Sequence, residues 1–354
     1  MKSSKPTIQD VADIAGVSAI TVSRVLNGKT GVSDTTRAKI NSIIKDVGYH
    51  PNLGARALRG VNMGCIGVTT FSPVEVIPLS ESSLIWLFSE LYRVFGIRGE
   101  RICFDLNPHN ESNNGDFARS VWEQLFAACI IVGPIKNNDK LIERIHNSSL
   151  PYLTIGHLDS LPECSKATVN YEHGSYIATK KLIEAGHTSI ALLRSFDQFQ
   201  PGEDRLRGYL RALNEHNIEP QDHLIRSMTF SLKDNTETIR EVLSDSTVTG
   251  LVDSSSTDDA SILRKGAQLA GRSIGKDVDI ILWTYSNTVP VLPEALAHVW
   301  IPVFDAITQG LEELSKWYYG QAKGPVSVRL DPLLYETFPD AEPALRRPVF
   351  DIDD

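Results

Sequence analysis

The 354-residue chain has no run of about 18 apolar residues, so no segment offers itself as a membrane-spanning helix. Its polar start, MKSSKPTIQD, lacks the apolar core of a secretory signal peptide. Only four cysteines are present, and none forms a CxxC pair, which argues against a disulfide framework or a cysteine-ligated metal site. We therefore expect a cytoplasmic protein with reduced cysteines, no metal and no cofactor.

Charge is divided unevenly along the chain. The formal net charge is −9, but residues 1–60 hold nine Lys and Arg against four Asp, a net of +5. The other residues hold 26 basic and 40 acidic side chains, a net of −14. A basic head on an acidic body indicates that only the head meets a polyanion. The length allows a small head and one large or two-lobed body.

Three short helices joined by tight turns are predicted in the head. Thr7 and Asp10 have the spacing of a capping box, and Gly16 ends this first helix. Ser18 caps a second helix and Ser33 a third. The residues expected to face inward are Ile8, Val11, Ala12, Ala15, Val22, Val25, Leu26, Ile40, Ile43, Ile44 and Val47. Two helices joined by a turn containing Gly, closed by a third, form a helix-turn-helix unit, which we assign to residues 1–50.

Small and apolar side chains are left facing outward at the start of the second helix, where such units meet base edges in the major groove. The methyl groups of Ala19 and Ile20 suit thymine methyls, and Arg24 can bond guanine bidentately. The hydroxyls and amides suited to DNA phosphates are those of Thr7, Ser18, Thr21, Ser23, Asn27, Ser33, Thr36, Tyr49 and Asn52. The alternative, a packing subdomain with ordinary helix caps, leaves the outward Ile20 and the division of charge unexplained.

The head contains the run T-I-Q-D-V-A-D-I-A-G-V-S-A-I-T-V-S-R-V-L-N-G, followed by V-S-D-T-T-R, G-Y-H-P-N and A-R-A-L. These motifs closely resemble the lactose/galactose repressor (LacI/GalR) family of bacterial transcription regulators, nearly without interruption from Thr7 to Leu58. The resemblance implies that Ala19, Ile20 and Arg24 select operator bases. It also implies a hinge helix in which Leu58 wedges into the minor groove and kinks the duplex.

The hinge and linker, residues 51–62, have a composition that suits this role. Residues 52–60 are too few for a stable isolated helix, and Gly54 weakens helix formation further by about 1 kcal/mol relative to Ala. We therefore expect the segment to order only when DNA and a partner copy supply contacts. Leu58 lies between Arg56 and Arg59, as an apolar wedge between phosphate contacts would. Alternatively, Leu58 packs against the body.

Beyond residue 62, short apolar runs alternate with helical patterns. The runs predict buried parallel strands at 65–69, 128–132, 152–155, 189–193, 249–252 and 278–283, and the helical patterns cover 83–95, 174–185, 205–216 and 261–270. This order predicts an α/β body of two doubly wound parallel sheets, with a ligand cleft at the carboxyl ends of the strands.

Two stretches of the body carry the resemblance further: V-N-Y-E-H-G-S-Y-I-A-T-K-K-L-I-E-A-G-H-T-S-I-A-L-L (169–193) and R-L-R-G-Y-L-R-A-L (205–213). They are similar to the family's effector and dimerisation domain, here residues 63–354, which has the periplasmic-binding-protein fold. The likeness implies one lobe of about 63–159 and 290–321 and another of about 160–289 and 322–345. It places Arg205 where the family reaches ligand hydroxyls, with Asn170 and His173 bordering the cleft. His187 is better explained as a structural residue that bonds a loop.

The family's sugar pocket is only partly present. L-W-T-Y at 282–285 stands where the family reads Gly-Phe-Asp-Asp, so the acidic pair is missing, and Ile301 replaces a usual Gln. Trp283 and Tyr285 can stack on a sugar ring, and we expect them to line the effector site with Arg205. For Trp283 alone, packing in the core is the stronger alternative.

Three classes of protein compete for this sequence. A solute-binding protein explains the body but leaves the head without a purpose. An enzyme triad drawn from 254–256, His187 and Asp residues has no G-x-S-x-G motif or metal-ligand spacing to support it. A regulator that is not an enzyme explains every part. We expect a homodimeric repressor that binds a near-palindromic double-stranded DNA operator and a small-molecule effector of carbohydrate type. A corepressor, an activating role and a tetramer stay open.

Overall fold

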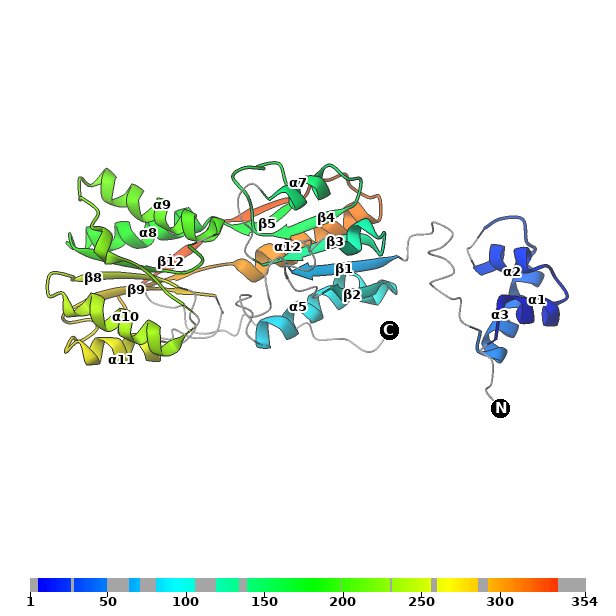
Figure 1. Ribbon diagram of the computed structural model, residues 1–354, viewed down its shortest axis with the longest axis horizontal. Helices are drawn as coiled ribbons and strands as arrows, with labels where there is room; N and C mark the ends of the chain where they lie inside the picture. Colours follow the sequence, from blue (N-terminus) through cyan, green and yellow to red (C-terminus); the bar gives the residue numbers. More distant parts are fainter. Residues whose placement is uncertain are drawn as a thin grey trace. The chain divides into compact units, whose positions relative to one another are not determined.

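The computed structural model describes residues 6–26, 29–49, 64–70, 81–105, 119–133, 139–197, 199–229, 231–255, 260–285 and 292–336. The chain divides into two units, Met1–Met63 and Gly64–Asp354, which we call the head and the body (Figure 1). Asn27, Asn52 and Leu58 lie outside the described residues. Among the helices within the described ranges, none is long and apolar enough to cross a membrane.

The head is built from helices α1 (Ile8–Ala15), α2 (Ala19–Leu26) and α3 (Asp34–Val47). The predicted capping box is confirmed, because the Thr7 N–H donates to the Asp10 carboxylate at 2.7 Å and the Asp10 N–H donates to Thr7 Oγ1 at 3.3 Å. Gly16 ends α1 at a φ of 69°, a conformation that glycine adopts without strain. The Ser33 hydroxyl caps α3 by accepting from the Thr36 N–H.

One apolar core holds the three head helices together. Its fully buried members are Val11, Ala12, Val22 and Ile40, one or two from each helix. The other residues predicted to face inward are buried (Ala15, Val25) or half-buried against this core (Ile8, Leu26, Ile43, Ile44, Val47). Tyr49 also lies in the core, and so a residue predicted to meet phosphates is mostly buried.

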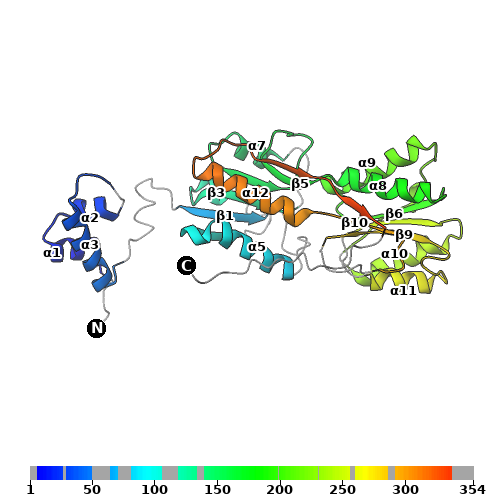
Figure 2. The ribbon, with the colours of Figure 1, turned by 180° about the vertical axis from the view of Figure 1, so that it is seen from behind.

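The body contains two six-stranded sheets, and we call each sheet with its helices a lobe (Figures 1 and 2). The first sheet is wholly parallel, in the order β11-β5-β4-β3-β1-β2. Its strands are β1 (Cys65–Thr70), β2 (Arg101–Asp105), β3 (Phe126–Val132), β4 (Tyr152–Ile155), β5 (Lys166–Val169) and β11 (Ser327–Leu330). Helices α5 (Glu81–Val94) and α12 (Val303–Tyr318) pack on one face, and α6 (Arg119–Trp122) and α7 (Lys140–His146) on the other.

The second sheet has the order β12-β10-β9-β8-β6-β7 and is parallel except for β12, which runs antiparallel to β10. Its strands are β6 (Ile190–Arg194), β7 (Ile225–Ser227), β8 (Gly250–Ser254), β9 (Asp279–Thr284), β10 (Ala297–Trp300) and β12 (Leu333–Tyr335). Helices α8 (Tyr171–Glu184) and α9 (Gln200–Glu215) cover one face (Figure 1). Helices α10 (Leu232–Ser244) and α11 (Ser261–Leu269) cover the other.

The chain passes between the lobes three times, after β5, after β10 and after β11. The lobe boundaries predicted from the resemblance are therefore wrong in three places. Strands β5 and β11 fall in the segments assigned to the second lobe but pair in the first sheet, and β10 falls in 290–321 but pairs in the second. These are short edge or next-to-edge strands, and an apolar pattern along the chain does not say which sheet a strand joins.

Candidate DNA-binding surface and effector site

Helix α2 carries an isoleucine that is unusually exposed for an apolar residue. Ile20, in the first turn, is 69% exposed, and Arg24 is exposed one turn further along. Both therefore point outward, as the sequence predicted. Ala19 differs from the prediction, because it is half-buried against the head core. Its single methyl group is short enough to pack at the start of the helix, between the turn and the core.

The hydroxyls predicted to meet phosphates cluster at helix starts. Ser18 Oγ accepts from the Thr21 N–H at 3.2 Å and lies 2.9 Å from Thr21 Oγ1. Ser33 and Thr36 repeat this arrangement at the start of α3, with their hydroxyl oxygens 2.8 Å apart. Helix N-termini carry partial positive charge and free N–H groups, which favour anions.

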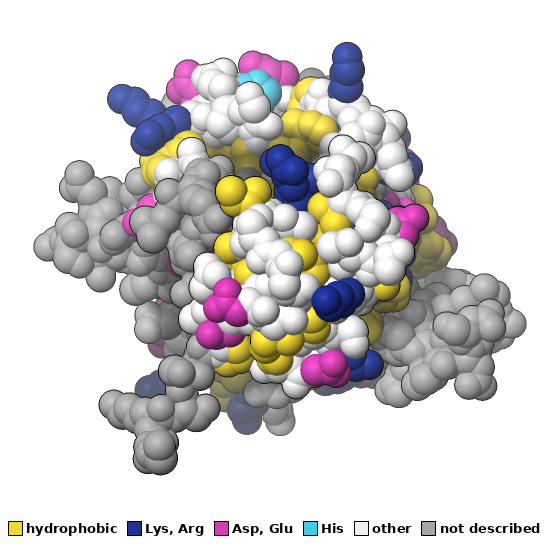
Figure 3. Space-filling model, turned by 90° about the vertical axis from the view of Figure 1, so that its right-hand side faces the viewer, with side chains coloured by type: hydrophobic (Ala, Val, Ile, Leu, Met, Phe, Trp, Pro, Cys, Tyr) yellow, Lys and Arg dark blue, Asp and Glu magenta, His cyan; other side chains and the backbone are white. Residues whose placement is uncertain are grey.

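Basic side chains of the head also bond the carbonyls near helix C-termini. Arg37 donates to the Lys29 carbonyl at 2.9 Å, and Lys39 donates to the Ala15 carbonyl at 3.0 Å. Figure 3 shows Lys and Arg side chains standing at separate places on the surface, among polar and hydrophobic atoms. On the face drawn, the Lys and Arg side chains of the described residues therefore stand apart from one another.

Arg205 is the centre of an aromatic cluster in the second lobe. It lies on α9, is only 2% exposed, and donates to the Tyr285 hydroxyl at 3.0 Å and to the Ser195 carbonyl at 3.1 Å. Its guanidinium carbon lies 5.0 Å from the ring centre of Tyr171 and 5.2 Å from that of Trp283. The predicted trio of Arg205, Trp283 and Tyr285 therefore comes together in the fold.

The cluster stands at the carboxyl ends of the parallel strands, where α/β folds bind ligands. Trp283 lies near the end of β9, Tyr285 directly follows that strand, and Ser195 directly follows β6. The ring of Phe196, 5.6 Å from the Arg205 guanidinium, and that of Tyr171 were not predicted. Tyr171 lies between Asn170 and His173, which were both predicted to border the cleft, and this position is the sequence signal that could have identified it.

Trp283 is part of the hydrophobic core, which is the alternative that the sequence favoured for this residue. Its side chain is 2% exposed, and its ring stacks on Tyr171 with centroids 6.1 Å apart and planes 12° from parallel. A Cβ at Gly174 would lie 3.0 Å from the indole, so glycine there leaves room for the ring. The buried indole Nε1 has no hydrogen-bond acceptor among the described residues. A buried N–H of this kind usually meets a ligand or water.

A buried carboxyl group at the end of β8 was also missed. Asp253 is 1% exposed, and its Oδ1 accepts from the backbone N–H of Ser255 at 3.0 Å and from its hydroxyl at 2.5 Å. Its Oδ2 accepts no hydrogen bond from the described residues. Burial raises the pKa of Asp253, and the bonds from Ser255 and the charge of Arg205 only partly oppose this. The sequence signal that could have identified Asp253 is an acidic residue that directly follows the predicted buried strand at 249–252.

Asn170 caps the start of α8, and His173 lies in the first turn of this helix. Asn170 Oδ1 accepts from the His173 N–H at 3.2 Å and from Arg329 at 2.7 Å, while its amide donates to Asp331 at 2.8 Å. These contacts join α8 to the crossover between β11 and β12. The ring of His173 stacks on Tyr176, with centroids 6.5 Å apart. The pair therefore borders the crossover rather than the rings around Arg205.

The residues of the imagined triad lie at opposite ends of β8. His187 bonds Thr249 Oγ1 at 2.9 Å and Asp279 Oδ2 at 3.0 Å, beside the start of the strand, which confirms its structural role. Ser254, at the other end, donates to the Leu193 carbonyl at 2.9 Å. Ser254 and His187 thus form no nucleophile and base pair.

Comparison with known proteins supports the same division into head and body. Residues 7–52 match the family described as "Bacterial regulatory proteins, lacI family". The catabolite control protein A of Priestia megaterium is 25% identical over 317 residues, which span 88% of this chain and 92% of that protein. The lac repressor dimer bound to operator and the anti-inducer ONPF has a TM-score of 0.73 at 19% identity, over 95% of this chain and 99% of that one. A complex of the transcriptional regulator CelR with cellobiose has a TM-score of 0.64 at 22% identity, over 94% and 99%.

A helix-turn-helix head, a two-lobed α/β body and relatives that regulate transcription define a DNA-binding transcriptional regulator and not an enzyme. The head, at residues 7–52, carries the domain of the lacI family of bacterial regulatory proteins, and the chain as a whole is similar to catabolite control protein A over 88% of its length.

Proposed function

We propose that this regulator is a repressor that binds a near-palindromic operator as a homodimer and is controlled by a carbohydrate-type effector. The observation that carries the DNA-binding part is the outward Ile20 on the first turn of α2, with Arg24 one turn further along. An apolar side chain so exposed gains by covering thymine methyls in the major groove. Ala19 contributes a smaller contact, because the core already takes part of its surface.

The remaining head residues fix the register on the duplex. Ser18, Thr21, Ser33 and Thr36 offer hydroxyls at two helix starts, and Thr7 does so at a third. Ser23, Asn27 and Asn52 complete the proposed phosphate contacts, and Tyr49 contributes only through the small part of its surface that the head core leaves exposed. Leu58 serves as the minor-groove wedge of the hinge segment.

An exposed apolar stripe on α5 supports the dimer. Ile85, Phe88 and Tyr92 are exposed at a spacing of three and four residues, which places them on one face of the helix. The apolar surface extends to strand β2, because the ring of Phe88 contacts that of Phe104 edge to face, with ring centroids 4.8 Å apart. Contiguous exposed aromatic rings usually mark an interface, and a symmetric dimer buries the same patch twice.

The cluster around Arg205 supports an effector site in the body. Arg205 and Tyr285 supply hydrogen-bonding groups beside the ring faces of Tyr171 and Trp283, a combination that suits a sugar ring. Asn170 caps the start of α8, the helix from which Tyr171 meets Arg205, and His173 lies in its first turn. The CelR structure contains cellobiose, which makes carbohydrates the first class to test. Effector binding shifts the population able to bind DNA only as far as its affinity differs between the two states.

Selection of bound duplexes from a random pool tests the proposal most directly. The purified full-length protein is incubated with the pool at about 150 mM salt, because nonspecific affinity falls steeply with salt. We expect a palindrome whose half-sites lie one helical turn apart, and retention that changes when carbohydrates are added. A folded, dimeric protein that retains no motif with or without carbohydrates contradicts the proposal.

A further inference from the structure

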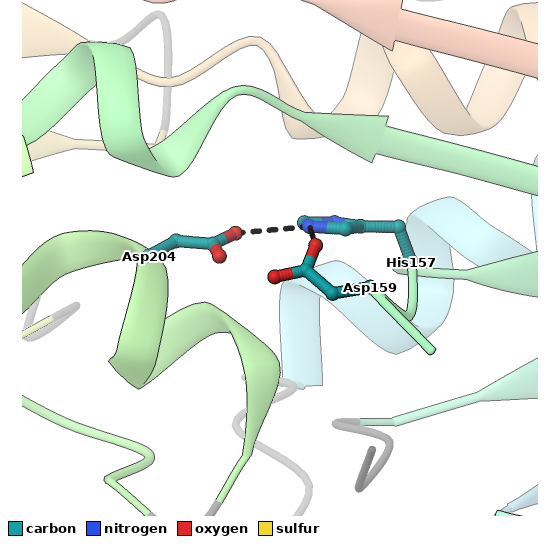
Figure 4. Close-up of side chains that lie close together, drawn as sticks. All are labelled: His157, Asp159 and Asp204. Carbon is teal, nitrogen blue, oxygen red and sulfur yellow. Dashed lines mark ion pairs between the residues drawn. The ribbon is translucent and has the colours of Figure 1, made fainter. Parts of the chain in front are cut away.

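A cluster of titratable side chains joins the two lobes of the body (Figure 4). His157 and Asp159 come from the loop between β4 and β5 in the first lobe, and Asp204 comes from α9 in the second. His157 Nε2 lies 3.1 Å from Asp204 Oδ2 and 3.8 Å from Asp159 Oδ1. One atom from each residue lies within 4.8 Å of the other two. Figure 4 shows the three side chains pointing toward one common position.

The outer atom of each carboxylate is held by other groups. Asp204 Oδ1 accepts from Gln200 Nε2 at 2.8 Å and from Arg207 at 2.5 Å. Asp159 Oδ2 accepts from the same two residues, both at 2.8 Å. The guanidinium of Arg207 therefore sits behind both carboxylates, while Asp204 Oδ2 and Asp159 Oδ1 lie on the side of the imidazole.

The imidazole of His157 is also held by a side chain outside the cluster. Its second nitrogen, His157 Nδ1, lies 3.1 Å from Thr168 Oγ1. In metal sites the ligand His usually bonds an outer partner through its other ring nitrogen, and the ligand carboxylates are bonded through their outer oxygens. All three residues of the cluster have such partners.

One inner oxygen is buried and faces the imidazole. Asp204 is 1% exposed, and its Oδ2 lies at an ion-pair distance of 3.1 Å from His157 Nε2 and accepts no other hydrogen bond from the described residues. A buried carboxylate oxygen with one partner has a further lone pair to offer, and it is aimed at the centre of the cluster. His157 is 9% exposed, so the imidazole is also nearly removed from solvent.

The charges around the cluster leave room for a cation. Arg207 pairs with the carboxylates of Asp159, Asp204 and Glu172, and Arg211 pairs with those of Glu172 and Glu215. Four carboxylates thus face two guanidinium groups, and the negative charge beside the imidazole is in excess. Asp159 is half exposed and gives an ion a route from solvent.

We propose that His157, Asp159 and Asp204 bind a divalent transition-metal ion, Zn²⁺ in the first instance, that bridges the two lobes. One imidazole nitrogen and two carboxylate oxygens are ligands that Zn²⁺ accepts, and three protein ligands leave a position for water. Because the ligands come from both lobes, the bound ion stabilises the arrangement of the lobes described above. None of the three ligands is a proposed DNA-binding residue, but the site adjoins the rings around Arg205: Asp204 directly precedes Arg205 on α9, and burial, together with the charge of Asp204, raises the pKa of Tyr171.

Titration with Co²⁺ tests the proposal, because a Co²⁺ ion in a site with nitrogen and oxygen ligands absorbs visible light. The full-length protein is first stripped with a chelator and then titrated with CoCl₂, and ZnCl₂ is added last. We expect visible bands that saturate at one ion per chain and disappear when Zn²⁺ displaces Co²⁺. We also expect Zn²⁺ to raise the Tm of the stripped protein, since a ligand that binds only the folded state stabilises it.

Variants assign the binding to these residues. Asp159→Asn changes a half-exposed carboxylate and should abolish saturable Co²⁺ binding while circular dichroism shows an intact fold. His157→Gln should do the same, and Thr168→Val, which removes only the outer partner of the imidazole, should weaken binding by about 10- to 100-fold. His187→Gln is the matched control, because His187 is also paired with a carboxylate, at 3.0 Å, but lies outside the cluster.

The proposal is overturned if the stripped wild-type chain shows no saturable Co²⁺ bands and no Zn²⁺-dependent rise in Tm. The cluster is then an imidazolium–carboxylate pair only. It is equally overturned if Asp159→Asn and His157→Gln bind Co²⁺ as tightly as the His187→Gln control.

Discussion

Truncating two isoleucines of the head to alanine should have opposite effects, although the chemical change is the same. Ile40 is fully buried in the head core, between residues of α1 and α2 such as Val11 and Val22. Ile20 is 69% exposed on α2. Ile40→Ala therefore tests what holds the head together, and Ile20→Ala tests what the head recognises.

The expected magnitude for Ile40→Ala follows from its burial. Removing a buried isoleucine side chain to alanine costs about 2–5 kcal/mol, through lost transfer energy and the cavity left behind. A domain of this size has only about 3–5 kcal/mol from a single core. A loss of about 3 kcal/mol raises the unfolded-to-folded ratio of the head roughly 100-fold. For Ile20→Ala the change in the free energy of unfolding should stay within about 0.5 kcal/mol, because the side chain is mainly in water.

Both variants are measured in the full chain by urea titration, with head and body followed separately through assigned methyl NMR signals. We expect Ile40→Ala to shift the head transition alone and to reduce specific and nonspecific DNA affinity together. Ile20→Ala should relax the preference at one or two operator positions and leave the salt dependence nearly unchanged. Ile14→Ala, exposed on α1, is the control for a surface truncation. Equal destabilisation by Ile20→Ala and Ile40→Ala would refute the assignment of core and recognition faces.

Three further changes test the body. Gly208→Ala adds a methyl that overlaps a backbone carbonyl of α8, so the urea midpoint of the body should fall by an amount equivalent to about 1–3 kcal/mol or more; an unchanged midpoint would rule out this close helix contact. Burial raises the pKa of Asp204, but the neighbouring imidazole, amide and guanidinium outweigh it, so this pKa lies below its usual value. The lowered pKa of Asp204 stabilises the folded chain when the pH is above the pKa that Asp204 has in the unfolded chain. This stabilisation is lost as the pH falls through the pKa of Asp204 in the folded chain. With chelator present, Asp204→Asn should therefore lower the Tm at pH 7 and much less in acid, whereas a pH-independent difference contradicts the pairing. Phe88→Glu on α5 should convert a dimer to monomers in sedimentation, while Leu232→Glu, exposed on α10, should not; a dimer that survives Phe88→Glu excludes this face.

Local chemistry explains which parts of the fold could be predicted. The capping box at Thr7, the glycine at 16 and the cap at Ser33 depend on residues within four positions of one another, and all three are confirmed. The six predicted strands are runs of apolar residues buried on both faces, and each overlaps an observed strand. The strands that were missed, such as R-I-C-F-D and S-V-R-L, carry charged residues because they lie at sheet edges, where one side meets solvent.

Contacts between distant segments account for the remainder. The rings of Tyr171 and Phe196 meet Arg205 only because α8, β6 and α9 come together at one end of the second sheet. Burial of Ala19 and Tyr49 depends on how three helices close on one another. Periodicity along the chain carries no record of such neighbours.

The sequence alone determined the head: its helix caps, its turn and its outward Ile20 depend on near neighbours and on solvent, and its motifs carry the family resemblance. Only the tertiary structure decided which sheet β5, β10 and β11 join, and that His157 and Asp204, 47 residues apart, face each other from different lobes. The physical reason is that capping and periodicity act over a few residues of chain. Sheet membership and side-chain clusters depend on distances in space, which the chain sets only when it closes on itself.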